Sequence, residues 1–215
     1  MESIKVYKDR AIESLSGNWG KGAITLLVAD VVIYITMGIF NFITSSEIWG
    51  GLLSYVLMQP LYWGMTVFFL GIARGEEMTV GRVFDGFKDF GRIFTTMFLC
   101  FLYIILWGML LVIPGVIKGY SYMMTPYILK DNPEMKNNEA IEKSMEMMNG
   151  HKMDLFLLDL SLIGWAILCL FTLGIGFLFL GSYQDTAHAH FYEDLKKEQE
   201  AFEAGNGGGR QVSHF

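Results

Sequence analysis

Residues 93–113 read IFTTMFLCFLYIILWGMLLVI and contain no charged side chain. A helix needs roughly 20 predominantly apolar residues to cross the hydrocarbon core of a bilayer, so this stretch predicts a transmembrane helix. The whole chain has a similar character: 53% of its 215 residues are hydrophobic and only 18% are charged. A soluble domain has about 25% charged residues, and disordered chains are poor in apolar residues. The composition therefore excludes disorder and favours an integral membrane protein.

Six segments are candidates for membrane spans, and all of them are predicted to be helical. They are residues 23–43, 52–73, 93–113, 116–129, 155–171 and 175–191. The fourth and sixth segments carry more polar residues than the others, so each fits either a short span or a surface segment. The sequence pattern therefore allows four or six spans, and both numbers place the two termini on the same side.

The distribution of positive charge favours six spans. Lys and Arg accumulate on the cytoplasmic side near the ends of spans. With six spans, all 16 Lys and Arg residues except Lys118 lie on one side, whereas four spans would export residues 118–152 with five lysines. We therefore expect a single multi-pass domain over residues 1–203 in the cell membrane, with both termini cytoplasmic. The Gly-rich residues 204–215 are expected to form a flexible tail.

Three segments that precede pairs of predicted spans resemble one another. They begin at Arg10, Arg82 and Glu139, and they read RAIESLSGNWGKG, RVFDGFKDFGRIF and EAIEKSMEMMNGHKMDLF. Each contains an apolar–acidic pair, followed by a glycine, a basic residue and a span. The glycines Gly17 and Gly150, and likewise Gly91, are expected to end a helix. The pattern predicts a unit of one surface helix and two spans that is repeated three times. Amphipathic linkers that arose by chance are the alternative.

The three segments also carry apolar stripes at helical spacing. The stripes are Tyr7, Ala11 and Leu15; Val80, Val83, Phe84, Phe87 and Phe94; and Ile141, Met145 and Met148. Such helices suit the headgroup plane of a bilayer, where the apolar residues dip into the acyl boundary and the charges stay in water. We therefore expect an all-α bundle of six transmembrane helices with three cytoplasmic, interfacial amphipathic helices.

Several stretches resemble a family of bacterial integral membrane proteins. They include SLSGNWGKG at 14–22, IPGVIKGYSYMMTPYILKDNPEM at 113–135, AIEKSMEMMNGHKMDLFLLDLSLIGWAILCLFTLGIG at 140–176 and HFYEDL at 190–195. These stretches are similar to the proteins filed as domain of unknown function 975. The closing FYEDL also resembles the end of the membrane domain that accompanies some bacterial glycerophosphodiesterases. The first resemblance implies a membrane topology and a bacterial origin, and it implies no mechanism.

Polar residues within the predicted spans are candidates for a functional site. The set is Asp30, Gln59, Asp159, Gln184, Asp185 and His188. A charge at the bilayer centre costs at least about 2.5 kcal/mol, so an ionisable residue there indicates an ion or proton site by default. The structural alternative is hydrogen bonding that ties two helices together. We expect the polar residues of the last span to turn inward, toward Asp30 or Gln59.

No catalytic or cofactor motif is recognisable. Asp185 and His188 share a helical face, but His190 points elsewhere and no further metal ligand is evident. The chain has no nucleophile elbow, P-loop or dinucleotide fingerprint. Its net charge of −6 disfavours nucleic acid as a partner. We therefore expect neither a metal nor another cofactor.

The sequence predicts a non-enzymatic membrane protein that handles or scaffolds lipids or other membrane proteins. Its expected partners are the bilayer, anionic lipids and other membrane proteins. A small transporter or channel with a polar path through Asp30, Gln59 and Asp185 is the second interpretation. A membrane enzyme that acts on lipid headgroups is the third.

Overall fold

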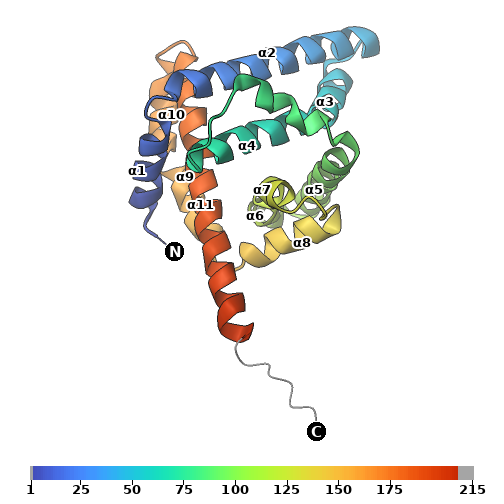
Figure 1. The fold of residues 1–215 in the computed structure, drawn as a ribbon. Coiled ribbons are helices and arrows are strands. Elements are labelled where there is room, and N and C mark those ends of the chain that lie inside the picture. The colour runs from blue at the N-terminus through green and yellow to red at the C-terminus, as the bar shows by residue number, and fades with distance from the viewer. Residues whose placement is uncertain (1, 208–215) are drawn as a thin grey trace.

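The computed structural model describes residues 2–207, and every regular element in that range is a helix (Figure 1). In chain order the elements are α1 (Ile4–Leu15), α2 (Trp19–Thr44), α3 (Glu47–Leu57), α4 (Gln59–Ala73), the 3₁₀ helix η1 (Val80–Phe87), α5 (Phe90–Leu110), α6 (Val112–Tyr122), α7 (Thr125–Asp131), α8 (Asn138–Met147), α9 (Lys152–Leu160), α10 (Ile163–Leu170) and α11 (Ile175–Gly207). The all-α prediction is confirmed. Residues 204–207 of the predicted tail continue α11, and residues 208–215 lie outside the described part.

Three segments are long and apolar enough to cross a membrane: α2, α5, and α9 together with α10. The pair α3 and α4 is a fourth if it counts as one bent span. These four coincide with the predicted spans at 23–43, 52–73, 93–113 and 155–171. The segments predicted at 116–129 and 175–191 are helical but do not meet the same criteria of length and composition.

Proline accounts for two of the breaks in the helical hairpins, those between α3 and α4 and between α6 and α7. α3 ends at Leu57, and α4 begins at Gln59 with Pro60 in its first turn. Proline has no N–H to donate and clashes with the preceding turn, and the two helices are bent by 49°. In the same way, α6 ends at Tyr122 and α7 begins at Thr125 with Pro126 in its first turn.

Three pairs of helices pack against each other across a turn: α2 with α3, α5 with α6, and α10 with α11. The side chains at these turns are apolar and exposed. The most exposed are Phe42, Ile48, Met109, Val112, Phe171 and Leu173. Glu47 is the only charged residue in 31–73, and none occurs in 93–117 or 160–184. Soluble monomers rarely expose apolar surfaces of this extent, so these three hairpins suit a lipid environment.

The helices do not all run side by side as in a simple bundle. Figure 1 shows α2 crossing the beginning of α11 at a steep angle. Small residues permit this close crossing: a side chain at Gly22 would meet Ser182, and one at Gly181 would meet Leu26. Such small-residue contacts are a common way for membrane helices to approach each other.

Two of the three predicted apolar stripes face the protein. Tyr7, Ala11 and Leu15 are almost completely buried, because α1 packs along α11 with the ring centroids of Tyr7 and Phe191 5.3 Å apart. Ile141 and Met148, on and just after α8, are also buried. The prediction that these stripes dip into the bilayer is therefore wrong, since the adjacent helices supply apolar partners.

The stripe of η1 and α5 is different: Val83 is buried against α4, but the phenylalanines remain partly on the surface. Its phenylalanines form a continuous row of ring contacts with centroid distances of 5.1–6.4 Å: Phe84, Phe87, Phe90, Phe94 and Phe98. The first three side chains are each about 40% exposed. An interfacial position for this stripe stays a prediction.

The predicted glycine stops are correct in two of three places. Gly17 and Gly150 follow α1 and α8, and they have φ angles of +79° and +90°. This left-handed conformation suits glycine, which has no Cβ. Gly91 instead lies in the first turn of α5, so the prediction is wrong there.

The backbone of η1 lies directly on α4. A Cβ atom at Gly64 would overlap the carbonyl oxygen of Val83, and one at Gly86 would overlap the carbonyl oxygen of Pro60. Both contacts involve backbone atoms, which cannot rotate away as a side chain can. The contact therefore fixes η1 on α4 and requires glycine at both positions.

Gly64→Ala is expected to destabilise the protein by about 1–3 kcal/mol, the usual cost of overpacking. The measurement is the thermal unfolding midpoint of the purified protein in detergent. Gly38→Ala in α2 is the matched control, because a Cβ atom there meets nothing within 4 Å. Alanine at such a position raises helix propensity by about 1 kcal/mol. Equal midpoints for the two variants would contradict the backbone contact.

Candidate functional site

The polar residues of the last predicted span lie on one long helix. α11 is continuous because residues 182–203 contain neither Gly nor Pro and are rich in good helix formers. Gln184 and His188 are four positions apart and therefore share a face of the helix. Both side chains point toward α9, where they meet a single carboxylate.

Asp159 of α9 is the centre of this polar cluster. Its Oδ1 accepts a hydrogen bond from Gln184 Nε2 at 3.1 Å and lies 2.6 Å from Nε2 of His188. Its Oδ2 accepts a hydrogen bond from the Tyr120 hydroxyl at 3.0 Å. We call Tyr120, Asp159, Gln184 and His188 the Asp159 cluster. It connects α6, α9 and α11, and Tyr120 is a member that the sequence did not reveal.

The cluster satisfies a buried carboxylate well. The side chains of His188 and Asp159 are only 9% and 18% exposed. An ionised carboxylate accepts hydrogen bonds at both oxygens, and here both oxygens have partners from other helices. A carboxylate and an imidazole at this distance can also share a proton. The geometry therefore supports helix cross-linking directly and proton binding as a second possibility.

An open cavity of about 270 Å³ adjoins the cluster. Tyr120, Asp159 and Gln184 form its polar part, and the remaining wall is apolar, including Phe156 and Leu180. The carboxylate thus lies at the edge of a space large enough for water or a small molecule.

The other predicted site residues do not join this cluster. Gln59 is buried and donates to the carbonyl oxygen of Tyr55, one turn earlier in the chain. Asp30 is half-buried on α2 and forms no hydrogen bond or salt bridge with a described residue. Asp185, next to Gln184, is also half-buried and makes none within the described range. The structure therefore does not place all six predicted residues along one path.

The expectation that α11 turns its polar residues toward Asp30 or Gln59 is wrong. α11 does contact α2, but it does so through the small residues Gly181 and Ser182. Gln184 and His188 lie on a different face of the helix and reach Asp159 instead. Close packing of small residues against α2 leaves no room for long polar side chains on that side.

A second polar group, also unpredicted, joins the carboxy-terminal ends of α4 and α7 to the middle of α11. Arg74 donates to both carboxylate oxygens of Asp131, from Nη1 at 2.8 Å and from Nη2 at 2.7 Å, and its Nε donates to Glu193 at 2.8 Å. Asp131 also accepts from Lys196 at 2.7 Å and from the Tyr192 hydroxyl at 3.1 Å. We call these five residues the ionic hub. A bidentate arginine–carboxylate pair is among the stronger polar interactions in proteins.

The charges of the ionic hub stabilise one another. Burial opposes ionisation of Asp131, but the hydrogen bonds and positive charges of Arg74 and Lys196 outweigh it and lower the pKa of Asp131 to about 2. Burial also opposes the charged form of Arg74, yet its bonds to Asp131 and Glu193 raise the pKa of this guanidinium. Both groups are therefore charged at neutral pH.

The same end of the molecule also ties α1 to α11. Arg10 forms a salt bridge with Asp194 at 2.7 Å, and Ser14 Oγ lies 2.9 Å from Nε2 of His190. His190 therefore faces α1, away from the Asp159 cluster. Within residues 2–207, no group of three or more His, Cys, Asp or Glu side chains is arranged to bind a metal ion.

The sequence provides only weak evidence for the ionic hub. Arg74 follows the predicted span 52–73, and Asp131 follows 116–129 by two residues before the Asn132-Pro133 dipeptide. Charges at span ends are common, so neither residue stands out alone. Their pairing depends on how the hairpins pack.

Comparison with known proteins shows a family match for part of the chain. Residues 108–199 match a family described as "Protein of unknown function (DUF975)". The matched range contains the whole Asp159 cluster and Asp131, Tyr192, Glu193 and Lys196 of the ionic hub, but not Arg74. No curated protein and no solved structure matches the chain. The predicted likeness to a glycerophosphodiesterase membrane domain is not shown.

Proposed function

Because its segment 108–199 belongs to the DUF975 family, whose function is not established, we propose a function from the geometry of the molecule. The protein is a non-enzymatic, multi-pass membrane scaffold that holds lipids or other membrane proteins. One observation carries this proposal: three exposed apolar hairpins extend from a base whose charged side chains bind one another. The hairpins suit the bilayer, and the base keeps them in a fixed arrangement.

Contacts at the base support six membrane-crossing segments. Arg92, in the first turn of α5, donates to the carbonyl oxygens of Leu129 at 3.2 Å and Met135 at 3.0 Å. In the proposed topology the chain enters the membrane along α5. The end of α7 lies beside the start of α5, so the chain has returned to the same side by then. Arg74, just after α4, likewise lies beside Asp131 and beside Glu193 of α11. Each hairpin thus begins and ends near the same base, which favours a return through 116–129 and through 175–191.

Matching positions in α1 and α8 support the threefold repeat. Tyr7, Ala11 and Leu15 are buried at spacings of four residues, and Gly17 follows two positions later. Ala140, Ser144 and Met148 are buried at the same spacings, and Gly150 follows two positions later. In this register the two helices dock on the hairpins through equivalent faces. The second copy, η1, departs from it and packs through Val83 and Gly86.

The polar groups favour a scaffold over a transporter. In the ionic hub, Arg74 donates to Asp131 and Glu193, and Asp131 also accepts from Lys196. Groups with this pairing hold helices together and leave little capacity for a passing substrate. The Asp159–His188 contact beside its cavity is the one observation that favours the alternative of a proton or ion pathway.

Cysteine labelling tests the proposed topology. In a background lacking Cys100 and Cys169, Glu134→Cys should resist an impermeant thiol reagent added to intact cells, because the segment after α7 is cytoplasmic. Glu47→Cys, at the α2–α3 turn, should be labelled. Both glutamates are exposed, so the same substitution is made in each case. Labelling of Glu134→Cys in intact cells would refute six spans and restore four.

A further inference from the structure

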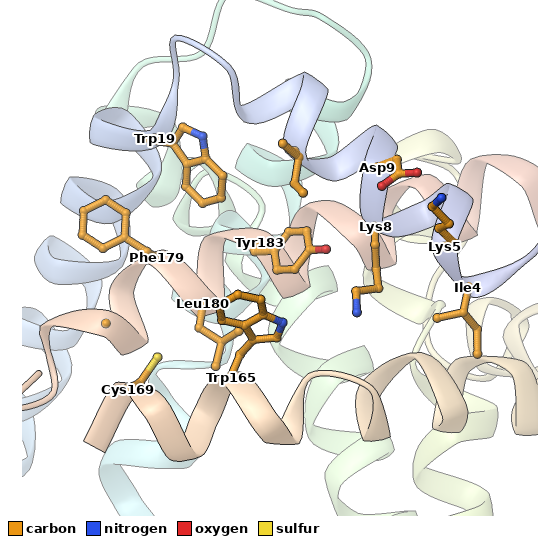
Figure 2. A pocket seen from close by; sticks show the side chains of 12 residues that line it. Ile4, Lys5, Lys8, Asp9, Trp19, Trp165, Cys169, Phe179, Leu180 and Tyr183 are labelled. Atoms are coloured by element: carbon orange, nitrogen blue, oxygen red, sulfur yellow. The ribbon is translucent and has the colours of Figure 1, made fainter. Parts of the chain in front are cut away.

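A groove of about 630 Å³ runs between α1 and the α10–α11 hairpin. Trp19, Phe179 and Cys169 lie toward one end of it, and Ile4 and Lys5 lie toward the other (Figure 2). Trp19 is in ring contact with both Phe179 and Tyr183, at centroid distances of 6.3 and 6.5 Å. The groove is therefore elongated and mainly apolar, and its charged residues lie near one end.

The charged end carries two lysines and one acid. Figure 2 shows the Lys8 ammonium group extending from α1 into the space above the helix that carries Trp165. Arg10 of the same helix is paired with Asp194, whereas neither Lys5 nor Lys8 forms a salt bridge with a described residue. Asp9 offsets one of the two charges, so the end of the groove keeps a net positive charge.

The direction of the groove matches the direction of the hairpin. Gly176, Leu180 and Tyr183 line it along α11 from near the α10–α11 turn toward the base. The seven positions from Gly176 to Tyr183 correspond to about 10 Å along a helix. The lysines lie toward the base, where Arg10 forms an ion pair with Asp194 and Ser14 contacts His190. The apolar part lies toward the exposed turn.

From this geometry we propose that the groove binds an anionic phospholipid of the surrounding leaflet. An acyl chain lies against Trp165, Phe179 and Leu180, and the phosphate group lies near Lys5 and Lys8. The proposal rests on the proposed function, since it requires the hairpin to be in a bilayer. It adds to that function a chemical class of ligand and a place where the ligand binds.

Charge complementarity selects the anionic class. A lysine close to an anionic lipid surface contributes about 1 kcal/mol, which is roughly a fivefold gain in affinity. A zwitterionic lipid has a positive group that opposes this gain. The other candidate occupant is a second copy of this chain. Such a copy would present its own acidic surface, and it has no aliphatic chain that matches the length of the groove.

Cys169 provides a reporter inside the groove. It is partly exposed there, whereas Cys100 is buried elsewhere. The full-length protein is purified in a non-ionic detergent, and the rate of thiol modification is measured while phosphatidylglycerol or phosphatidylcholine is added to the micelles. Phosphatidylglycerol should protect Cys169 at a mole fraction roughly 10-fold lower than phosphatidylcholine. Equal protection by the two lipids would overturn the proposal.

Charge-removing variants complete the test. Lys5→Gln/Lys8→Gln should weaken protection by phosphatidylglycerol roughly 10-fold and leave protection by phosphatidylcholine unchanged. Lys136→Gln/Lys143→Gln removes the same charge near α8, far from the groove in sequence, and should behave as the wild type. An equal loss in both double variants would show a general surface effect and would overturn the proposal. Protection that is present without lipid and lost on dilution would identify a second copy as the occupant, and would also overturn it.

These outcomes are separate from those of the topology experiment. Labelling of Glu134→Cys in intact cells would refute six spans without changing the relation between Cys169 and added lipid. Conversely, equal protection by the two lipids would remove the lipid site and leave the membrane topology intact.

Discussion

Asp131→Asn should lower the thermal unfolding midpoint of the purified protein by about 4–8 °C at pH 7. Removing one partner of a buried ion pair costs about 3–5 kcal/mol. Here Arg74 is 23% exposed and keeps its bond to Glu193, so the expected cost is nearer 2 kcal/mol. In a chain of this length, each 1 kcal/mol shifts the midpoint by about 2–4 °C. Asp89→Asn is the control, because Asp89 is 53% exposed and its pair with Arg92 lies within one helical turn.

The effect of Asp131→Asn should depend on pH in a defined direction. The pKa of Asp131 is lowered to about 2 in the folded protein, compared with about 3.9 in an unfolded chain. A group with a lowered folded-state pKa contributes its full stabilisation above the unfolded value and loses it as the pH falls toward the folded value. The difference in midpoint between wild type and Asp131→Asn should therefore be constant from pH 7 to about 5 and shrink toward pH 2. A midpoint at pH 7 no lower than that of Asp89→Asn would contradict the ionic hub.

Asp159→Ala should destabilise the protein by several kcal/mol, because it removes the acceptor of Tyr120, Gln184 and His188 together. Each buried polar group left without a partner costs about 1–3 kcal/mol. Asp159→Asn keeps one oxygen as an acceptor and should cost less. The measurement is again the unfolding midpoint in detergent. Asp185→Asn serves as the comparison, since Asp185 makes no hydrogen bond with a described residue and the change should be nearly neutral.

The same variants separate a scaffold from a proton pathway. The wild-type protein reconstituted in liposomes should give no proton flux above that of empty liposomes, as reported by an internal pH dye. A flux that appears with the wild type and disappears in folded Asp159→Asn would reject the scaffold and establish the transport alternative. With that outcome, the Asp159 carboxylate would carry protons in addition to joining helices.

The sequence predicts those features of the fold that depend on one segment alone, and it does not predict contacts between distant segments. Residues 93–113 are uncharged, so hydropathy alone locates α5. The stripe of α1 is visible as a pattern, but the pattern does not say whether lipid or protein covers it. α11 supplies Phe191 as the partner of Tyr7, and a sequence cannot show that choice. Amphipathic periodicity thus identifies a helix with one buried face and leaves the burying partner open.

The sequence indicated most of the polar residues of the Asp159 cluster, but it did not indicate which of them contact one another. Asp159 and His188 stand out as polar residues in apolar stretches of sequence. Burying such groups without a hydrogen-bond partner costs free energy, so the sequence indicates that they must find partners. Which polar groups meet depends on the rotation of α11 about its axis. That rotation is set by the small residues Gly181 and Ser182 against α2, a packing effect between segments far apart in the chain. The ionic hub was missed for a related reason, because each of its charges resembles an ordinary charge at a span end.

The ionic hub also constrains how the protein is made. Arg74 and Asp131 are synthesised well before Glu193 and Lys196, so the hub cannot close until the last helix has left the ribosome. Until then, the base of the first two hairpins has only part of its polar network, the bidentate pair of Arg74 and Asp131. A chain that stops before α11 lacks the partners of Arg10, Ser14 and Asp159 as well. In the proposed topology, completion of the carboxy-terminal helix is therefore what closes the polar contacts between the hairpins and α1.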